Sequence, residues 1–90
     1  MPEEHLREVL EELRAELERS DAIDPETRAL LHAAREEIED ALTEDLPGAQ
    51  HRASTARTRI GQAIERFRGE HPEAAELLHR VLHALSDVGI

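Results

Sequence analysis

Apolar residues recur with a period of 3.6 along most of the chain, and helix-breaking residues stand between the periodic runs. This pattern predicts four amphipathic helices, over about residues 2–19, 25–45, 50–68 and 72–87. We therefore expect an all-α fold, an antiparallel helical bundle that forms a single domain over residues 1–90.

The residues between the helices predict where each helix begins and ends. Asp24 is suited to cap the second helix, with Pro25 in its first turn, and Pro47-Gly48 is expected to end that helix. Gly69 is placed to stop the third helix in the left-handed backbone conformation, and Gly89 is placed to stop the fourth.

The apolar faces of the helices differ in width. The first helix carries a narrow seam of four leucines, Leu6, Leu10, Leu13 and Leu17. Such a seam is suited to one partner helix. The fourth helix is apolar over about half of its circumference, which is typical of a central or interface helix. In the third helix, Gly61 marks either close packing or a weak point that costs about 1 kcal/mol relative to alanine.

A chain of 90 residues builds only a small core, and Phe67 is its one aromatic residue. Sharing apolar surface with a second copy would enlarge that core. We therefore expect the bundle to be completed by homodimerisation through the third and fourth helices. The residues expected at this contact are Ile60, Ile64, Phe67, Leu78, Leu82 and Leu85.

The charge of the chain is strongly acidic and unevenly distributed. The net charge is −10, from 21 acidic residues and 11 arginines, with no lysine. Residues 1–45 hold 16 acids and 5 arginines, a net −11, while residues 46–90 hold 5 acids and 6 arginines, a net +1. A net negative chain is repelled by polyanions, so we do not expect nucleic acid as a partner. A salt-adapted cytoplasm or a GC-rich genome is an equally good explanation of this composition.

Arginines border the apolar stripe of the third helix. Arg52, Arg59 and Arg66 are seven residues apart along one edge of the stripe, as charged residues are at the margins of a coiled coil. The acidic residues of the first two helices are their expected partners, either within one chain or between chains.

The chain contains no cysteine, so disulfides and thiolate metal sites are excluded. Its first 20 residues are charged throughout, and no stretch approaches the roughly 18 apolar residues of a membrane span. We expect a cytoplasmic protein that has no membrane partner.

Both ends of the chain carry patterns found in a known family. They are His5-Leu6-Arg7-Glu8-Val9-Leu10, Leu13 and Glu16-Leu17 at the start, and Phe67, His71-Pro72, Leu78, Arg80-Val81-Leu82, Ala84-Leu85-Ser86 and Gly89-Ile90 at the end. Over nearly its full length the chain resembles the small bacterial proteins called domain of unknown function 4404, apart from Asp87-Val88, where that pattern is nearer Asn-Met. The resemblance implies a short, helical, cytoplasmic bacterial protein without an assigned activity, and it adds no catalytic or ligand residues.

Histidines are the only candidates for metal binding or acid–base chemistry. His79 and His83 are four residues apart on one helix, so both could reach one Zn²⁺. Arg80 stands where the HExxH motif of metalloproteases requires glutamate, and the sequence fixes no third ligand. We favour an exposed or structural role for both histidines, which should point away from the apolar arc.

No catalytic motif or phosphate-binding loop is present in the sequence. The leading hypothesis is a non-enzymatic, self-associating helical interaction or scaffold protein that needs no cofactor and whose protein partner the sequence does not identify. The alternative is a small metal- or ligand-responsive regulator that uses His79 and His83.

Overall fold

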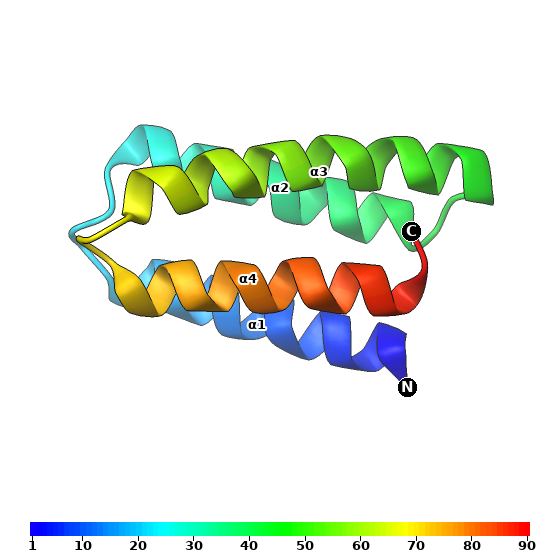
Figure 1. The fold of residues 1–90 in the computed structure, drawn as a ribbon, viewed down its shortest axis with the longest axis horizontal. Coiled ribbons are helices and arrows are strands. Elements are labelled where there is room, and N and C mark those ends of the chain that lie inside the picture. The colour runs from blue at the N-terminus through cyan, green and yellow to red at the C-terminus, as the bar shows by residue number, and fades with distance from the viewer.

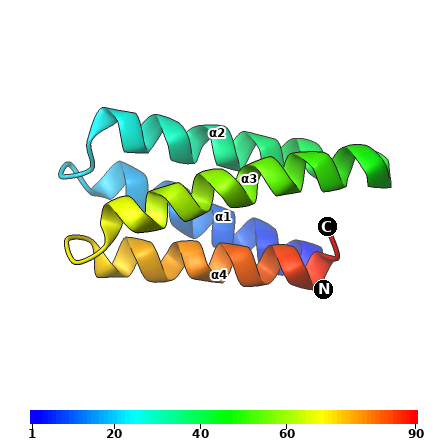
Figure 2. The ribbon, with the colours of Figure 1, turned by 45° about the horizontal axis from the view of Figure 1, so that its top comes forward.

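The computed structural model describes residues 1–90 and contains four helices and no strand. The helices are α1 (Pro2–Arg19), α2 (Pro25–Ala41), α3 (Leu46–Phe67) and α4 (Pro72–Val88). They lie side by side, and consecutive helices run in opposite directions (Figure 1; Figure 2). The expected all-α class is confirmed, and the bounds of α1 and α4 agree with the expected ranges to within one residue.

The helices pack in two main pairs. α1 packs chiefly against α4 and α2 against α3, while α3 and α4 join the two pairs. The ends of the chain therefore lie at the same end of the bundle, opposite the loops that follow α1 and α3 (Figure 1). None of the four helices has both the length and the apolar character needed to cross a lipid bilayer.

A cluster of 20 buried apolar residues fills the space between the helices. All four leucines of the α1 seam are buried in it, which confirms the narrow face predicted for this helix. In α3 the buried positions include four alanines, Ala49, Ala53, Ala56 and Ala63. Small side chains on a buried helix face let neighbouring backbones come close, and α2 is the helix on which α3 chiefly packs.

The boundary between α2 and α3 differs from the prediction. α2 ends at Ala41 rather than near residue 45, and α3 begins at Leu46 rather than near residue 50. Pro47 does not end α2, because it lies in the first turn of α3, where its missing N–H leaves no helical hydrogen bond unmade. The turn between the helices is instead closed at Thr43, whose backbone N–H and hydroxyl both donate to the carbonyl of Asp40.

The glycine stops of α3 and α4 are confirmed. Gly69 and Gly89 have φ angles of +82° and +90°, the left-handed region that glycine adopts without steric cost. α1 ends differently, because Arg28 of α2 donates hydrogen bonds to the carbonyls of Leu17 and Ser20. This arginine fixes the connection between α1 and α2.

Asp24 caps α2 as predicted. Its carboxylate accepts hydrogen bonds from the hydroxyl of Thr27 at 2.7 Å and from the backbone N–H of Thr27 at 3.1 Å. The hydroxyl oxygen of Thr27, which is fully buried, also lies 3.3 Å from Nη1 of Arg66 and accepts a hydrogen bond from it. The hydroxyl and backbone hydrogen bonds from Thr27 hold the pKa of Asp24 below its ordinary value.

We expect the cap to make stability depend on pH in the acidic range. Because the pKa of Asp24 is lowered by folding, its contribution is present above the unfolded value of about 3.9 and is lost as the pH falls through the folded value. The melting temperature of Asp24→Ala should therefore be lower than that of wild type at pH 6, and the difference between the two melting temperatures should narrow below about pH 4. Thermal melts followed by circular dichroism test it, with the exposed Asp21→Ala as a control that should match wild type at both pH values. A deficit in Asp24→Ala that is the same at pH 6 and pH 3 would contradict the assignment.

Candidate interaction surface

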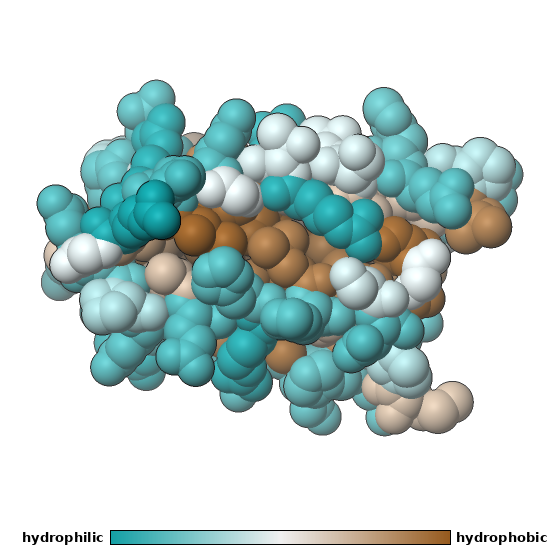
Figure 3. All heavy atoms as spheres, viewed as in Figure 1, coloured by the Kyte–Doolittle hydropathy of each residue, from teal (hydrophilic) through white to brown (hydrophobic).

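An apolar groove runs between α3 and α4. Figure 3 shows brown, hydrophobic surface along the line between these helices, bordered by hydrophilic side chains. At the end of the groove near the α3–α4 loop its volume is about 530 Å³. Its apolar and small lining residues are Gly61, Ile64, Phe67, Gly69, Pro72 and Ala75. This end of the groove is open to solvent, and Ile64 and Ala75 keep part of their surface exposed in it, whereas Phe67 lies buried beneath.

Three apolar residues of this face are only partly covered by the chain itself. Ile64, Ala75 and Leu82 pack against the core but keep part of their surface exposed. Gly61 lines the groove together with Ile64 and Ala75, and a Cβ added there would meet no other atom within 4 Å. Packing within the chain therefore does not require glycine at this position.

The six residues expected at a self-association contact divide into two groups. Ile60, Phe67, Leu78 and Leu85 are between 0 and 2% exposed, so they belong to the core of the single chain and not to an exposed contact face. Ile64 and Leu82 are the two that remain partly exposed. Of the six predicted residues, only Ile64 and Leu82 remain candidates for a contact with another chain. Gly61 and Ala75, which line the groove, join them in the candidate surface.

Ion pairs with α2 and with the turn that follows it line the opposite margin of α3. Arg59 lies 3.2 Å from Glu37, Arg66 lies 3.4 Å from Glu26, and Arg52 pairs with Glu44. The three arginines spaced by seven residues thus find their acidic partners within the chain, on α2 and in the turn that follows it. Because every one of these side chains keeps at least 20% of its surface exposed, solvent screens the pairs and each contributes at most about 1 kcal/mol. Their main effect is to fix the register of α3 on α2.

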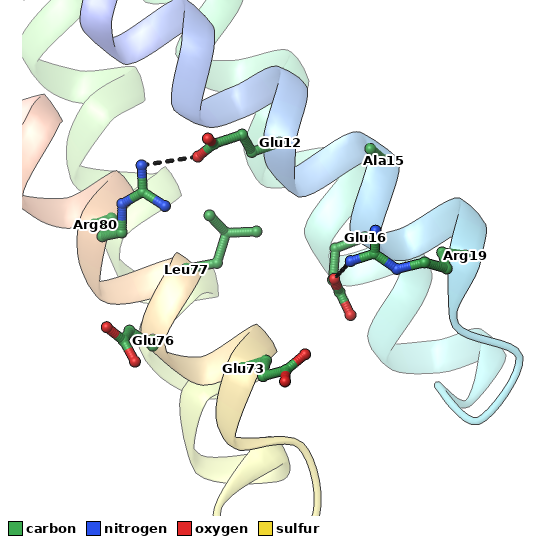
Figure 4. A pocket seen from close by; sticks show the side chains of 8 residues that line it. All are labelled: Glu12, Ala15, Glu16, Arg19, Glu73, Glu76, Leu77 and Arg80. Carbon is green, nitrogen blue, oxygen red and sulfur yellow. Dashed lines mark hydrogen bonds and ion pairs between the residues drawn. The ribbon is translucent and has the colours of Figure 1, made fainter.

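A second groove, between α1 and α4, is lined mainly by charged side chains. Figure 4 shows Arg80 of α4 directed at Glu12 of α1, a pair separated by 2.8 Å. Arg19 pairs with Glu16 in the same region, and Leu77 supplies the apolar floor. Since its arginines already have acidic partners on the chain, this groove is less suited to apolar contact than the α3–α4 groove.

A family model described as domain of unknown function (DUF4404) matches residues 6–90 of the chain. The chain belongs to this family. The resemblance carried by the two ends of the sequence is thereby confirmed. No curated protein and no solved structure matches the chain. Membership of DUF4404 assigns no role to any residue, so the roles of residues in this chain rest on its own geometry.

The two paired histidines of this DUF4404 chain are exposed one turn apart on α4. His79 borders the α3–α4 groove, and both side chains lie on the side of α4 away from buried Leu78 and Val81, as the sequence predicts. No group of three His, Cys, Asp or Glu side chains in the chain is arranged to hold a metal ion. His79 and His83 could therefore supply two ligands to a metal ion, and no third side chain of the same chain is arranged beside them.

Two other features of this DUF4404 chain escaped prediction from sequence. Arg57 of α3 donates a hydrogen bond to the carbonyl of Ile90, which holds the end of α4 against α3. The ring of His71, at the start of α4, packs against the ring of Phe67 in a T-shaped arrangement with a centroid distance of 5.3 Å. The Arg57 contact joins residues 33 positions apart, so no local pattern could have signalled it.

Proposed function

We propose that this DUF4404 chain is a non-enzymatic, self-associating interaction or scaffold protein, and that a second copy of the chain occupies its α3–α4 groove. The observation that supports this proposal best is the partial exposure of two large apolar side chains. Ile64 lines the groove, and Leu82 is seven residues after Ala75 of the groove and therefore on the same face of α4. A second copy would cover both side chains and so extend the small core of each chain.

The charge distribution favours the α3–α4 face over the rest of the surface. Residues 1–45, which form α1 and α2, carry 16 acids and 5 arginines, a net −11. Residues 46–90, which hold α3 and α4, carry 5 acids and 6 arginines, a net +1. Two copies that met through α1 and α2 would repel one another strongly, whereas two α3–α4 faces are nearly neutral.

The shape of the groove also fits another helix. Gly61 and Ala75 lie on its two sides and permit close approach of a second backbone. Ile64 supplies a larger side chain in the groove, and Leu82 supplies another, two turns further along the same face of α4. A glycine in mid-helix costs about 1 kcal/mol, and a partner helix passing over Gly61 would compensate for this cost. A two-fold arrangement places the same face of both copies in contact, as in most homodimers.

Sedimentation equilibrium tests the proposal. At tens of micromolar the wild-type chain should have twice its monomer mass of 10.2 kDa. Leu82→Glu and Ile64→Glu each place a charge in the contact and should weaken dimerisation by at least about 10-fold, or about 1.4 kcal/mol. Far-ultraviolet circular dichroism will show that each variant remains helical.

The matched control is Gln62→Glu, which adds the same charge to an exposed position of α3. It should dimerise nearly as wild type does. A wild-type mass of 10.2 kDa at every concentration would overturn the proposal, as would folded Leu82→Glu and Ile64→Glu variants that dimerise as well as wild type.

A further inference from the structure

The outer face of α4 carries a line of side chains that neither the core nor the ion pairs of the chain use. His79 and His83 lie at its centre, one helical turn apart and both exposed. Glu76 precedes them by three residues and Asp87 follows by four, and neither carboxylate forms an ion pair within the chain. Residues three and four apart share a helix face, so all four lie in one row.

Two neutral imidazoles one turn apart are a good partial ligand set for a divalent transition metal ion. Zn²⁺ in a closed site takes four nitrogen, sulfur or oxygen ligands in a tetrahedral arrangement. One chain provides no third ligand arranged beside this pair. A site built on His79 and His83 is therefore incomplete in the single chain.

We propose that His79 and His83 form a two-histidine half-site for Zn²⁺ or a similar transition metal ion, and that the same pair from a second copy completes it. The inference rests on the proposed self-association, because a copy in the α3–α4 groove lies beside α4. His79 itself lines that groove. If two α4 helices cross antiparallel with their histidine-bearing faces together, midway between His79 and His83 along the helix axis, His79 of each chain faces His83 of its partner.

The carboxylates of Glu76 and Asp87 should make association of the two copies depend on the charge of the metal ion. In the same antiparallel crossing, Glu76 of one chain approaches Asp87 of the other. These like charges repel across the contact when no cation is present. A bound divalent cation offsets the repulsion, so it should strengthen association of the two copies.

The ligand chemistry separates metal ions from one another. Imidazole nitrogen suits Zn²⁺, Cu²⁺ and Ni²⁺, whereas Mg²⁺ and Ca²⁺ prefer oxygen ligands, including coordinated water molecules. Mg²⁺ therefore serves as a probe of charge alone. It tests whether the two carboxylates, without the histidines, account for any effect.

Titration of the full chain with ZnCl₂, followed by calorimetry and sedimentation velocity, tests the inference. We expect one Zn²⁺ bound per two chains and a dimer dissociation constant at least about 10-fold lower in Zn²⁺ than in EDTA, since even changes around metal ligands alter affinity by about 10-fold or more. MgCl₂ at the same concentration should give no comparable change.

His79→Ala/His83→Ala should abolish this response to Zn²⁺ while the chain stays folded, because both residues are exposed. The matched control, His5→Ala/His51→Ala, removes two exposed histidines from α1 and α3 and should respond as wild type does. Absence of Zn²⁺ binding, one Zn²⁺ per chain without a change in mass, or equal loss of response in both double variants would overturn the half-site.

The two proposals fail in different ways. A chain that is dimeric in EDTA and indifferent to Zn²⁺ supports the groove contact and overturns the half-site. A chain that is monomeric in EDTA and dimeric in Zn²⁺ overturns self-association through the groove alone and supports the half-site. A chain that is monomeric in both solutions overturns both.

Discussion

Replacing Phe67 with alanine is expected to lower the free energy of unfolding by about 3–5 kcal/mol. Phe67 is the only aromatic residue of the chain, is 2% exposed, and lies in the last turn of α3, where its ring also meets His71. Removing it leaves a cavity beside the loop to α4 that no neighbouring large side chain can fill easily. Urea denaturation followed by circular dichroism measures the loss.

Phe67→Leu is the control for this prediction, because leucine keeps an apolar side chain in the site and should recover most of the lost stability. The unfolding slope in urea should be the same in all three proteins, since they expose similar surface on unfolding. A loss below about 1 kcal/mol for Phe67→Ala would show that the end of α3 is not packed as the structure describes.

Leu13→Ala should cost about 2–5 kcal/mol, the usual range for a buried leucine. Leu13 is 1% exposed in the seam of α1, the helix that packs on α4. Its truncation therefore weakens the pairing of the first and last helices. The same urea experiment gives the magnitude.

Leu46→Ala is the matched control, because Leu46 is 59% exposed at the start of α3. The same three carbons are removed from a position in water, so the change should stay within about 0.5 kcal/mol. Equal losses for the two variants would show that α1 does not bury its leucine seam against the bundle.

Much of the fold follows from local patterns in the sequence. The leucine spacing of α1, the cap at Asp24 and the glycine stops at Gly69 and Gly89 all depend on residues within a few positions of one another. The end of α2 was not predictable in this way. Proline followed by glycine can either stop a helix or occupy the first turn of the next, and at Pro47 the second outcome occurs.

Prediction of the surface was less successful, for a reason visible in α3. Ile60 and Ile64 are one turn apart on the same apolar stripe, yet Ile60 is fully buried and Ile64 is partly exposed. Periodicity identifies the apolar side of a helix but not how far each neighbour covers it. The ion pair between Arg59 and Glu37 was also only partly predictable. The sequence places Arg59 at the edge of the apolar stripe, but only the fold shows that its acidic partner lies on α2.

The pairing of α1 with α4 has a consequence for the order of folding. α2 and α3 are neighbours in sequence and can associate as soon as both exist, whereas the principal partner of α1 is the last helix to be synthesised. In a growing chain the leucine seam of α1 stays uncovered until α4 has been made. The bundle is therefore complete only when α1 contacts α4, the helix most distant from it in sequence. We expect this long-range contact, rather than helix formation, to limit the folding rate.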